Sequence, residues 1–527
     1  MKRTFLFAAP IALLLFAFVA DNSNDVRKTY AETITASDLK THLSILASDE
    51  YEGRETTKNG QKMAAKYIAE QFKSFGIPEL PGGGYYQDVP LLSKEAGAGT
   101  VIIPGDTFAF KKDFFYLPGI EDGITETKGV VFAGYGIQDS LYRDYNKLNV
   151  SGKTVIVLAE EPRDANGNSI ITHKKDLSDW STNRRRKMNE ARNRGASVLM
   201  IIVPDIAKAY EENRHHIETP TMQLYDEMMV EVSTTKRMQV LYISKTMADA
   251  ILKAGKKKNT VDKTIAAITK KKKTSGCSFT LPLSVRIERV GKIIHSENVL
   301  GYIEGSDLKE ELVVVTAHYD HLGKDGNIVF NGADDDGSGT VAVIEMAQAF
   351  AQAKKEGHGP RRSMLFMTVT GEEKGLLGSD WYTRHPVFPL KNTVCDLNID
   401  MIGRIDKAHE KDTDYVYVIG SDKLSSELKT ISEQANAQYV GLTMDYRFDV
   451  PNEPNSFYTR SDHYNFAKNG VPVAFFFNGV HADYHKETDE VKKINFPLME
   501  RRARLVFYTA WELVNRDKRI VVDKKTN

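Results

Sequence analysis

Side chains that can bind metal ions or transfer protons recur in five segments of the second half of the chain. His318 and Asp320 lie in an Ala-His-Tyr-Asp-His segment, and three adjacent aspartates lie in the segment from Asn331 to Gly339. Three adjacent carboxylates repel one another unless a cation neutralises them. Together the segments supply imidazoles and several carboxylates, the ligand mixture that suits zinc in an open catalytic site. The other three segments are Thr370 to Glu373, which reads Thr-Gly-Glu-Glu, the Asp400 segment Asn-Ile-Asp-Met-Ile-Gly-Arg, and Tyr484 to Asp489, which includes His485.

Each segment by itself also has a structural explanation. A histidine at a strand end is commonly a hydrogen-bonded loop residue, a pair of glutamates commonly begins a solvated helix, and aspartate often caps a helix. The metal-site hypothesis therefore depends on the whole series and on where it falls in the predicted fold.

Three of the five segments follow predicted buried strands. From Glu297 onward, apolar strands alternate with helices, which predicts an α/β fold with a mixed, mostly parallel sheet flanked by helices. In such sheets, ligands bind beyond the carboxyl ends of the strands. The predicted strands and helices are Leu312 to Thr316, Val341 to Ala351, Ser363 to Thr370, Leu376 to Arg384 and Val394 to Ile399.

Through these five ordered motifs, the stretch from Ser296 to Val514 resembles the co-catalytic di-zinc aminopeptidase family that includes glutamate carboxypeptidase II. The resemblance implies that two zinc ions are bound by five residues. By motif, these are His318, Asp335, Glu373, Asp400 and His485. Asp335 is chosen over Asp334 and Asp336 because it stands two residues before the Gly337-Ser338 pair, as the bridging aspartate of the family does.

The same resemblance implies roles for three further residues. Glu372 is expected to be the general base, Asp320 to be the partner of the zinc-bound His318, and Tyr484 to donate a hydrogen bond to the developing oxyanion. A carboxylate that is not itself a ligand can take a proton from water and pass it to a leaving amine. A carboxylate beside a metal-bound imidazole can fix the tautomer of that ring.

The resemblance also implies a domain organisation. We expect the N-terminal part of the peptidase domain at 32–100, an inserted α+β domain at 101–285, and the catalytic di-zinc domain at 286–520. The insertion resembles a protease-associated domain through Val131 to Gly136 and Gly152 to Val157, and the helical stretch from Leu46 to Gly76 resembles the opening helices of the family.

The N-terminus and the overall composition indicate an exported, soluble protein. Lys2 and Arg3 precede an almost wholly apolar run from Phe5 to Ala20, which predicts a signal peptide at 1–20, with an uncleaved anchor as the alternative. The formal net charge of +0 argues against nucleic acid as a partner, and we expect no membrane insertion beyond the signal. The two cysteines, Cys277 and Cys395, are too few for a disulfide framework.

The sequence thus favours an exported zinc exopeptidase that acts on peptides, and it predicts no particular oligomeric state. Aminopeptidase action is preferred because no arginine cluster for a substrate carboxylate stands out. The alternatives are a carboxypeptidase or dipeptidase of the same fold, a single-zinc aminoacyl cyclotransferase, and a non-catalytic receptor-like protein; the complete ligand series argues against the last two. Four further residues near the motifs are explained equally well by substrate contact and by structural ion pairs, namely Arg404, Arg460, Asp462 and His463.

Overall fold

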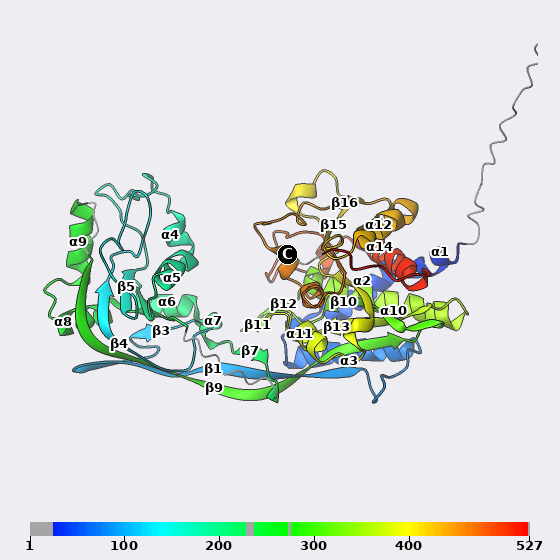
Figure 1. The fold of residues 1–527 in the computed structure, drawn as a ribbon, viewed down its shortest axis with the longest axis horizontal. Helices are drawn as coiled ribbons and strands as arrows, with labels where there is room; N and C mark the ends of the chain where they lie inside the picture. The colour runs from blue at the N-terminus through cyan, green and yellow to red at the C-terminus, as the bar shows by residue number, and fades with distance from the viewer. Residues whose placement is uncertain (1–24, 118, 228–236, 272–275, 525–527) are drawn as a thin grey trace, which may run out of the picture.

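The computed structural model describes residues 25–117, 119–227, 237–271 and 276–524. The predicted signal peptide at 1–20 lies outside the described residues. Two lobes are joined by the long strands β1 (Tyr86–Ile103) and β9 (Cys277–Ile303), as Figure 1 shows. These strands pair antiparallel from the Tyr86 and Val299 pair to the Ile102 and Ser284 pair, so they cross both predicted boundaries of the inserted domain.

The larger lobe contains one side of a single continuous sheet, in the order β16-β15-β17-β14-β10-β13-β9. Four strand pairs are parallel (β10 with β13, β10 with β14, β14 with β17, β15 with β16), and the pairs β15 with β17 and β13 with β9 are antiparallel. The predicted mixed, mostly parallel sheet is therefore confirmed. Its strands are β10 (Leu308–His318), β13 (Arg362–Val369), β14 (Thr393–Ile399), β15 (Tyr415–Ile419), β16 (Thr443–Asp445) and β17 (Val473–Phe477).

Helices cover both faces of this sheet, which explains why the buried parts of its central strands are mostly apolar. Alternate residues of β10 point to opposite faces: Val313 belongs to the large core, whereas Val314 belongs to a smaller core on the other face. The large core is built with α2 (Ala36–Leu46), α3 (Asn59–Ser74), α10 (Gly339–Lys355), α12 (Ser426–Ala435) and α14 (Phe496–Asn515), whereas α11 (Leu377–Arg384) and α13 (His463–Ala467) supply the other face.

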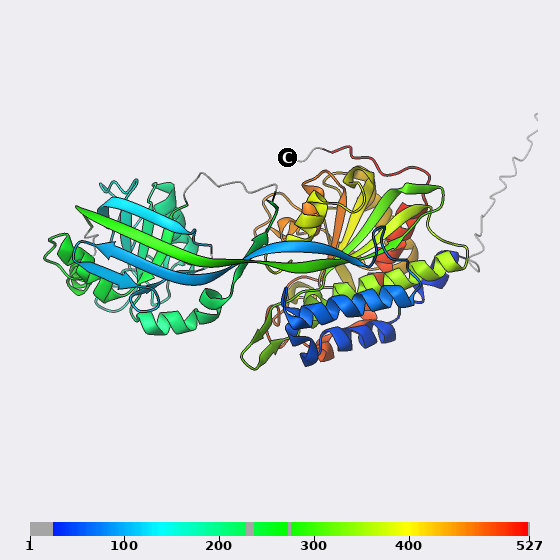
Figure 2. The ribbon, with the colours of Figure 1, turned by 90° about the horizontal axis from the view of Figure 1, so that it is seen from below.

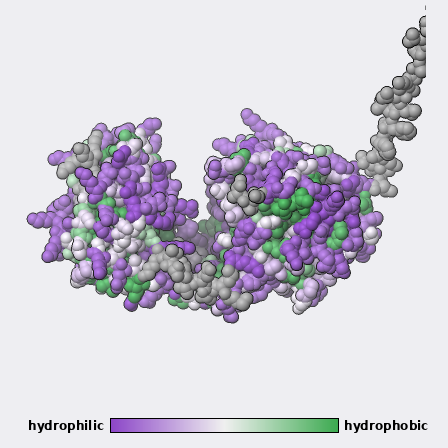
Figure 3. All heavy atoms as spheres, viewed as in Figure 1, coloured by the Kyte–Doolittle hydropathy of each residue, from purple (hydrophilic) through white to green (hydrophobic). Residues whose placement is uncertain are grey.

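The smaller lobe has its own apolar cores, built from residues between Val101 and Ile287. Its parallel strands β4 (Gly123–Phe132), β5 (Thr154–Leu158), β6 (Val198–Ile202) and β8 (Gln239–Ile243) continue the sheet beyond β9. Figure 2 shows β1 and β9 as a twisted ribbon between the lobes. In Figure 3, hydrophilic side chains dominate the visible face, which is hollowed between the lobes. The likeness to a protease-associated domain stays a prediction.

Among the residues that the structure describes, no helix combines the length and apolar character needed to span a bilayer.

A buried arginine ties the N-terminal segment to the loops that follow the central strand. Arg54, in the short helical segment η2 (Asp49–Arg54), is 1% exposed. Its guanidinium donates to the carbonyl oxygens of Tyr319 (2.8 Å), Asn331 (2.7 Å) and Gly332 (2.9 Å), and also to that of Leu46 (2.8 Å). The planar fork of arginine satisfies all four acceptors at once. The aspartate-rich loop that begins after Gly332 is thereby held against the end of β10.

We expect Arg54→Lys to lower the free energy of unfolding of the larger lobe by about 3 kcal/mol, because a lysine cannot reach all four carbonyls and each hydrogen bond from a charged donor contributes about 1.5 to 3 kcal/mol. Chemical denaturation followed by tryptophan fluorescence measures the change. Arg286→Lys is the control, since its side chain is 53% exposed. Equal stability of the two variants would contradict this role for Arg54.

Candidate metal centre

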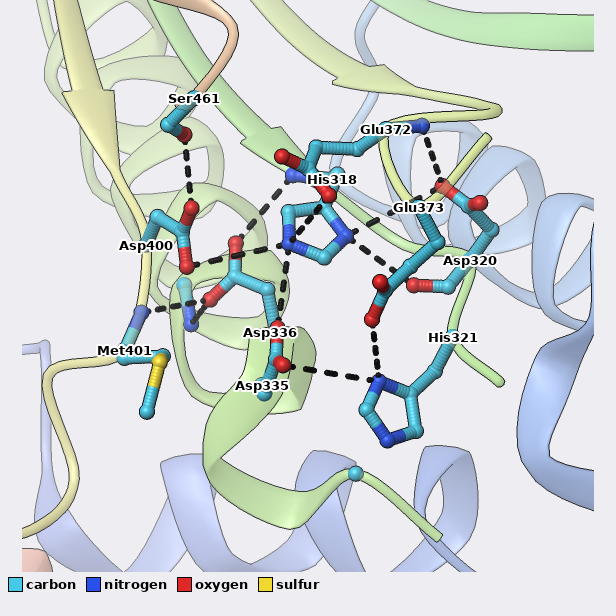
Figure 4. A network of polar contacts seen from close by, with 12 residues as sticks. His318, Asp320, His321, Asp335, Asp336, Glu372, Glu373, Asp400, Met401 and Ser461 are labelled. Atoms are coloured by element: carbon cyan, nitrogen blue, oxygen red, sulfur yellow. Dashed lines mark hydrogen bonds and ion pairs between the residues drawn. The ribbon is translucent and has the colours of Figure 1, made fainter. Parts of the chain in front are cut away.

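The carboxyl ends of three adjacent parallel strands bring several of the predicted residues together (Figure 4). His318 is the last residue of β10, Glu372 and Glu373 follow β13, and Asp400 follows β14 directly. Asp335 comes from the irregular segment η4 (Ala333–Ser338) that leads into α10, and His485 comes from the loop after β17. Sequence segments up to 167 residues apart, from His318 to His485, thus meet at one edge of the sheet.

One group of side chains surrounds the ring of His318. Its Nε2 lies 3.3 Å from Oδ1 of Asp335 and 3.7 Å from Oδ1 of Asp400. The side chains of His318, Asp335 and Asp400 are only 1%, 5% and 11% exposed. One imidazole and two carboxylates converge here closely enough to share a metal ion.

A second group lies on the other side of Asp335. Oδ2 of Asp335 is 3.0 Å from Nε2 of His485, and the same nitrogen is 3.4 Å from Oε2 of Glu373. Asp335 therefore directs one oxygen to each group, as a residue that bridges two ions must do. All five residues that the sequence predicted as ligands lie within this arrangement.

The neighbouring aspartates are engaged elsewhere. Oδ1 of Asp336 accepts from the backbone nitrogens of Gly339 (2.8 Å) and Met401 (3.0 Å), and its Oδ2 accepts from that of His318. Asp334 accepts through Oδ1 from the nitrogen of Gly403 (2.7 Å). The geometry therefore distinguishes three side chains that are identical in sequence, and it favours Asp335 as the shared one.

Backbone and hydroxyl donors fix the positions of the carboxylate-bearing loops. Oδ2 of Asp489 accepts from the backbone nitrogens of Asp334 (3.0 Å) and Asp335 (3.2 Å). The hydroxyl of Ser461 donates to Oδ2 of Asp400 at 2.6 Å. Asp335 and Asp400 are thus each held by a partner outside the two groups, which limits the movement needed to bind a cation.

Asp320 contacts the ring of His318 through its backbone carbonyl, whereas the sequence led us to expect a contact through its carboxylate. Nδ1 of His318 donates to the backbone carbonyl of Asp320 at 3.0 Å, whereas the carboxylate of Asp320 is 3.9 Å away. That carboxylate accepts from the hydroxyl of Thr56 (2.7 Å) and from the backbone nitrogen of Glu372 (3.1 Å). The Asp320 side chain therefore positions the Glu372 loop as well as lying beside the ring.

The pKa values of the two histidines show that the carboxylates of the centre lack positive counter-charge. Burial lowers the pKa of His318, but Glu372, Asp335 and Asp400 outweigh burial and raise that pKa well above its ordinary value. Burial likewise lowers the pKa of His485, which its contacts with Asp335 and Glu373 nevertheless raise to about 10. The imidazoles hold protons tightly because the carboxylates need a counter-charge. A bound cation would supply it and release those protons.

Two buried carboxylate oxygens without a hydrogen bond support the same conclusion. Oδ2 of Asp335 and Oε1 of Glu373 each lie within 3.0 Å of an imidazole nitrogen but accept no hydrogen bond from any described residue. Burying an ionised oxygen without a hydrogen bond costs free energy. The residues present therefore fit a metal ion in both groups.

Glu372 and Tyr484 border the same site without belonging to either group. Oε2 of Glu372 lies 3.9 Å from Nε2 of His318. Burial and the neighbouring Glu373 and Asp400 raise the pKa of Glu372 well above its ordinary value, although His318 opposes them. Tyr484 stacks on His485 with ring centroids 3.8 Å apart, and its hydroxyl accepts from Arg460 at 3.2 Å. Besides these groups, a small pocket at the site is lined by Met401, Phe457, Phe475, Phe477 and Val480.

Substrate contact and structural ion pairs explained four residues equally well in the sequence, and the structure distinguishes between these explanations. Arg404 pairs with Asp483 at 2.7 Å, and Asp462 and His463 are fully buried. Arg460 is exposed at the pocket beside Tyr484. Structural contacts thus account for Arg404, whereas Arg460 alone of the four faces the open pocket.

One buried residue at the centre was missed by sequence reasoning. His321, the second histidine of the Ala-His-Tyr-Asp-His segment, lies 2.9 Å through Nδ1 from Oε1 of Glu373. This histidine is visible in the sequence. However, side chains alternate along an extended segment, which would place the side chain of His321 on the opposite side from the side chains of His318 and Asp320.

Comparison with known proteins identifies relatives for the larger lobe. Residues 298–510 match Peptidase family M28. The chain is 28% identical to Aminopeptidase YwaD of Bacillus subtilis over 244 residues, which cover 44% of this chain and 47% of that protein. The chain spans about half the length of the curated relatives it matches. The resemblance inferred from the motifs is confirmed.

Two solved structures share the fold over nearly the whole chain. The aminopeptidase from Aneurinibacillus sp. strain AM-1 has a TM-score of 0.53 at 18% identity, with 95% of this chain and 98% of that chain covered. The protein described as BSAP, a zinc aminopeptidase from Bacillus subtilis, has a TM-score of 0.50 at 20% identity, with 93% and 99% covered. These likenesses confirm the fold class.

We expect Asp400→Ala and His485→Ala each to lower the metal content of the purified protein after dialysis, because each change removes a ligand from a different group. Elemental analysis measures moles of metal per chain. His358→Ala and Asp412→Ala, which alter exposed residues, are the matched controls. Metal content equal to that of the controls would exclude the altered residue as a ligand.

Proposed function

Since residues 298–510 match Peptidase family M28, we propose that the protein is an exported zinc aminopeptidase that hydrolyses peptide bonds. The observation that carries this proposal is the position of Asp335, which directs one oxygen to each of two groups of metal-binding side chains. Two adjacent cations are the arrangement that co-catalytic hydrolysis of amides uses.

The residues predicted from the sequence offer each zinc ion one imidazole and two carboxylates. His318, Asp335 and Asp400 would hold one ion, and Asp335, Glu373 and His485 would hold the other. Imidazole and carboxylate ligands together favour zinc over magnesium or calcium. When bound, two zinc ions lower the pKa of a shared water and polarise the scissile carbonyl.

Glu372 would act as the general base. Its carboxylate lies beside His318 but belongs to neither group, so it is free to take a proton from the attacking water. The same carboxyl would then pass that proton to the leaving amine nitrogen as the C–N bond breaks. Asp320 anchors the backbone nitrogen of Glu372, which holds the base at the mouth of the site.

Tyr484 would stabilise the oxyanion that forms on the substrate carbonyl. Its hydroxyl oxygen accepts from Arg460, which leaves its O–H free to donate. Stacking on His485 fixes the ring beside the centre. A donor already oriented towards developing charge requires little reorganisation during the reaction.

The pocket favours a free amino end over a free carboxylate end. Its lining includes the carboxylates of Asp335, Glu372 and Asp400, and among described lining residues Arg460 is the one guanidinium. Carboxylate oxygens that a cation leaves free can accept hydrogen bonds from a substrate ammonium group, whereas a substrate carboxylate finds one guanidinium, that of Arg460, among the described lining residues. The aromatic and aliphatic remainder of the lining would accept an apolar N-terminal side chain.

We expect Glu372→Gln to keep its metal content and to lose at least about 100-fold in kcat, because the amide cannot accept the proton of the attacking water. Elemental analysis and peptide hydrolysis are measured on the same preparation. Glu410→Gln, at an exposed position, is the control. Unchanged kcat in Glu372→Gln would remove Glu372 from the reaction.

We also expect the purified protein to cleave peptides with a free amino end, to spare the same peptides once N-acetylated, and to lose activity with a chelator and recover it with zinc. Liquid chromatography of the products measures the bond cleaved. Release of the C-terminal residue would indicate a carboxypeptidase, and cleavage of dipeptides alone a dipeptidase. Cyclisation of N-terminal glutamine, or no turnover of any peptide, would support the non-peptidase alternatives.

A further inference from the structure

His321 is a fully buried imidazole that the proposed catalytic cycle does not use. Its backbone nitrogen donates to the carbonyl of Arg54 at 3.1 Å, which fixes the chain just beyond β10. Its ring lies against Gly332, where a Cβ atom would come within 2.4 Å of the ring carbon Cδ2. The absence of a side chain at Gly332 therefore leaves room for this imidazole beside Asp335 and Glu373.

Nδ1 of His321 faces the second group of the centre (Figure 4). It lies 2.9 Å from Oε1 of Glu373 and 3.9 Å from Oδ2 of Asp335. The same Asp335 oxygen is 3.0 Å from Nε2 of His485, and the rings of His321 and His485 meet edge to face at a centroid distance of 6.0 Å. Four side chains thus surround one small volume from different directions.

The short contact between His321 and Glu373 is not an aligned hydrogen bond. Neither ring nitrogen of His321 forms a hydrogen bond with any described residue, and Oε1 of Glu373 accepts none either. Elsewhere, His409 approaches Asp445 at a similar distance, 3.1 Å, and there the ring nitrogen and the carboxylate do form a hydrogen bond. In the centre the two atoms are close but are not directed at each other.

Two atoms that bind the same cation are also close together without being directed at each other. Their lone pairs converge on the ion, so neighbouring ligand atoms come within roughly 3 to 4 Å of one another without forming a hydrogen bond, as ligand distances of about 2.0 to 2.2 Å require. Leaving a buried imidazole without any partner would cost free energy. A cation between Asp335, Glu373, His485 and His321 removes that cost for Nδ1.

We propose that His321 is a ligand, through Nδ1, of the zinc ion held by Asp335, Glu373 and His485. This inference rests on the proposed function, because it requires the metal centre. It makes the two positions unequal: the position of His318 and Asp400 has three protein ligands and keeps an open site, whereas the position of His485 has four. The four-ligand position would hold its ion more tightly, and the three-ligand position would leave more of the coordination of its ion open to substrate.

X-ray absorption at the zinc edge tests the proposal on the wild-type protein. Imidazole rings give a distinct scattering pattern, so the measurement counts histidines per metal. We expect three imidazoles over two zinc ions, from His318, His485 and His321. Two imidazoles over two zinc ions would overturn the role of His321 while leaving the proposed function intact. A wild-type protein that binds no zinc would overturn both.

The variant His321→Gln gives an independent test. Glutamine can still donate a hydrogen bond to Glu373 but lacks the ring nitrogen. We therefore expect two imidazoles over two zinc ions when zinc is saturating. We also expect the tighter ion to bind at least 100-fold more weakly, as measured by competition with a chromophoric chelator. Circular dichroism confirms that the variant is folded, and His358→Gln is the control. Unchanged affinity and an unchanged imidazole count would overturn the proposal.

Discussion

Mutual repulsion among buried carboxylates is the constraint on which the larger lobe depends. Asp335, Glu372, Glu373 and Asp400 approach one another at the carboxyl ends of β10, β13 and β14, where water is largely excluded. At these separations and low effective dielectric, like charges oppose folding unless they are neutralised. The scaffold must therefore supply enough binding energy elsewhere to hold this cluster together until a cation binds.

Backbone N–H groups and one guanidinium provide much of that support. Asp336 and Asp489 accept backbone hydrogen bonds from the loops on either side of the centre, and Arg54 joins the aspartate-rich loop to the end of β10 through carbonyl oxygens. These contacts pin the chain without using the oxygens of Asp335. The result is a rigid frame in which one carboxylate is left able to face two positions at once, which is what a shared ligand requires.

The sequence predicted the sheet and most of the centre because its strands are short apolar runs and the polar residues follow them. Asp335 was distinguished from Asp334 and Asp336 only by resemblance. The three residues are of the same type, and their different hydrogen bonds are visible only in the structure. His321 was not predicted, because it lies beyond the end of β10 at His318. Strand periodicity applied beyond that point gives the wrong direction for its side chain.

The two lobes are linked near the centre by more than the long strands. A short strand of the smaller lobe, β7 (Thr221–Leu224), pairs with β1, and its Met222 and Leu224 pack with Leu377 and Trp381 of α11. Two residues beyond β7, Asp226 contacts His385 at 3.0 Å, at the other end of the same helix. Because α11 begins four residues after Glu373, this part of the smaller lobe contacts the helix that directly follows the loop carrying the proposed base.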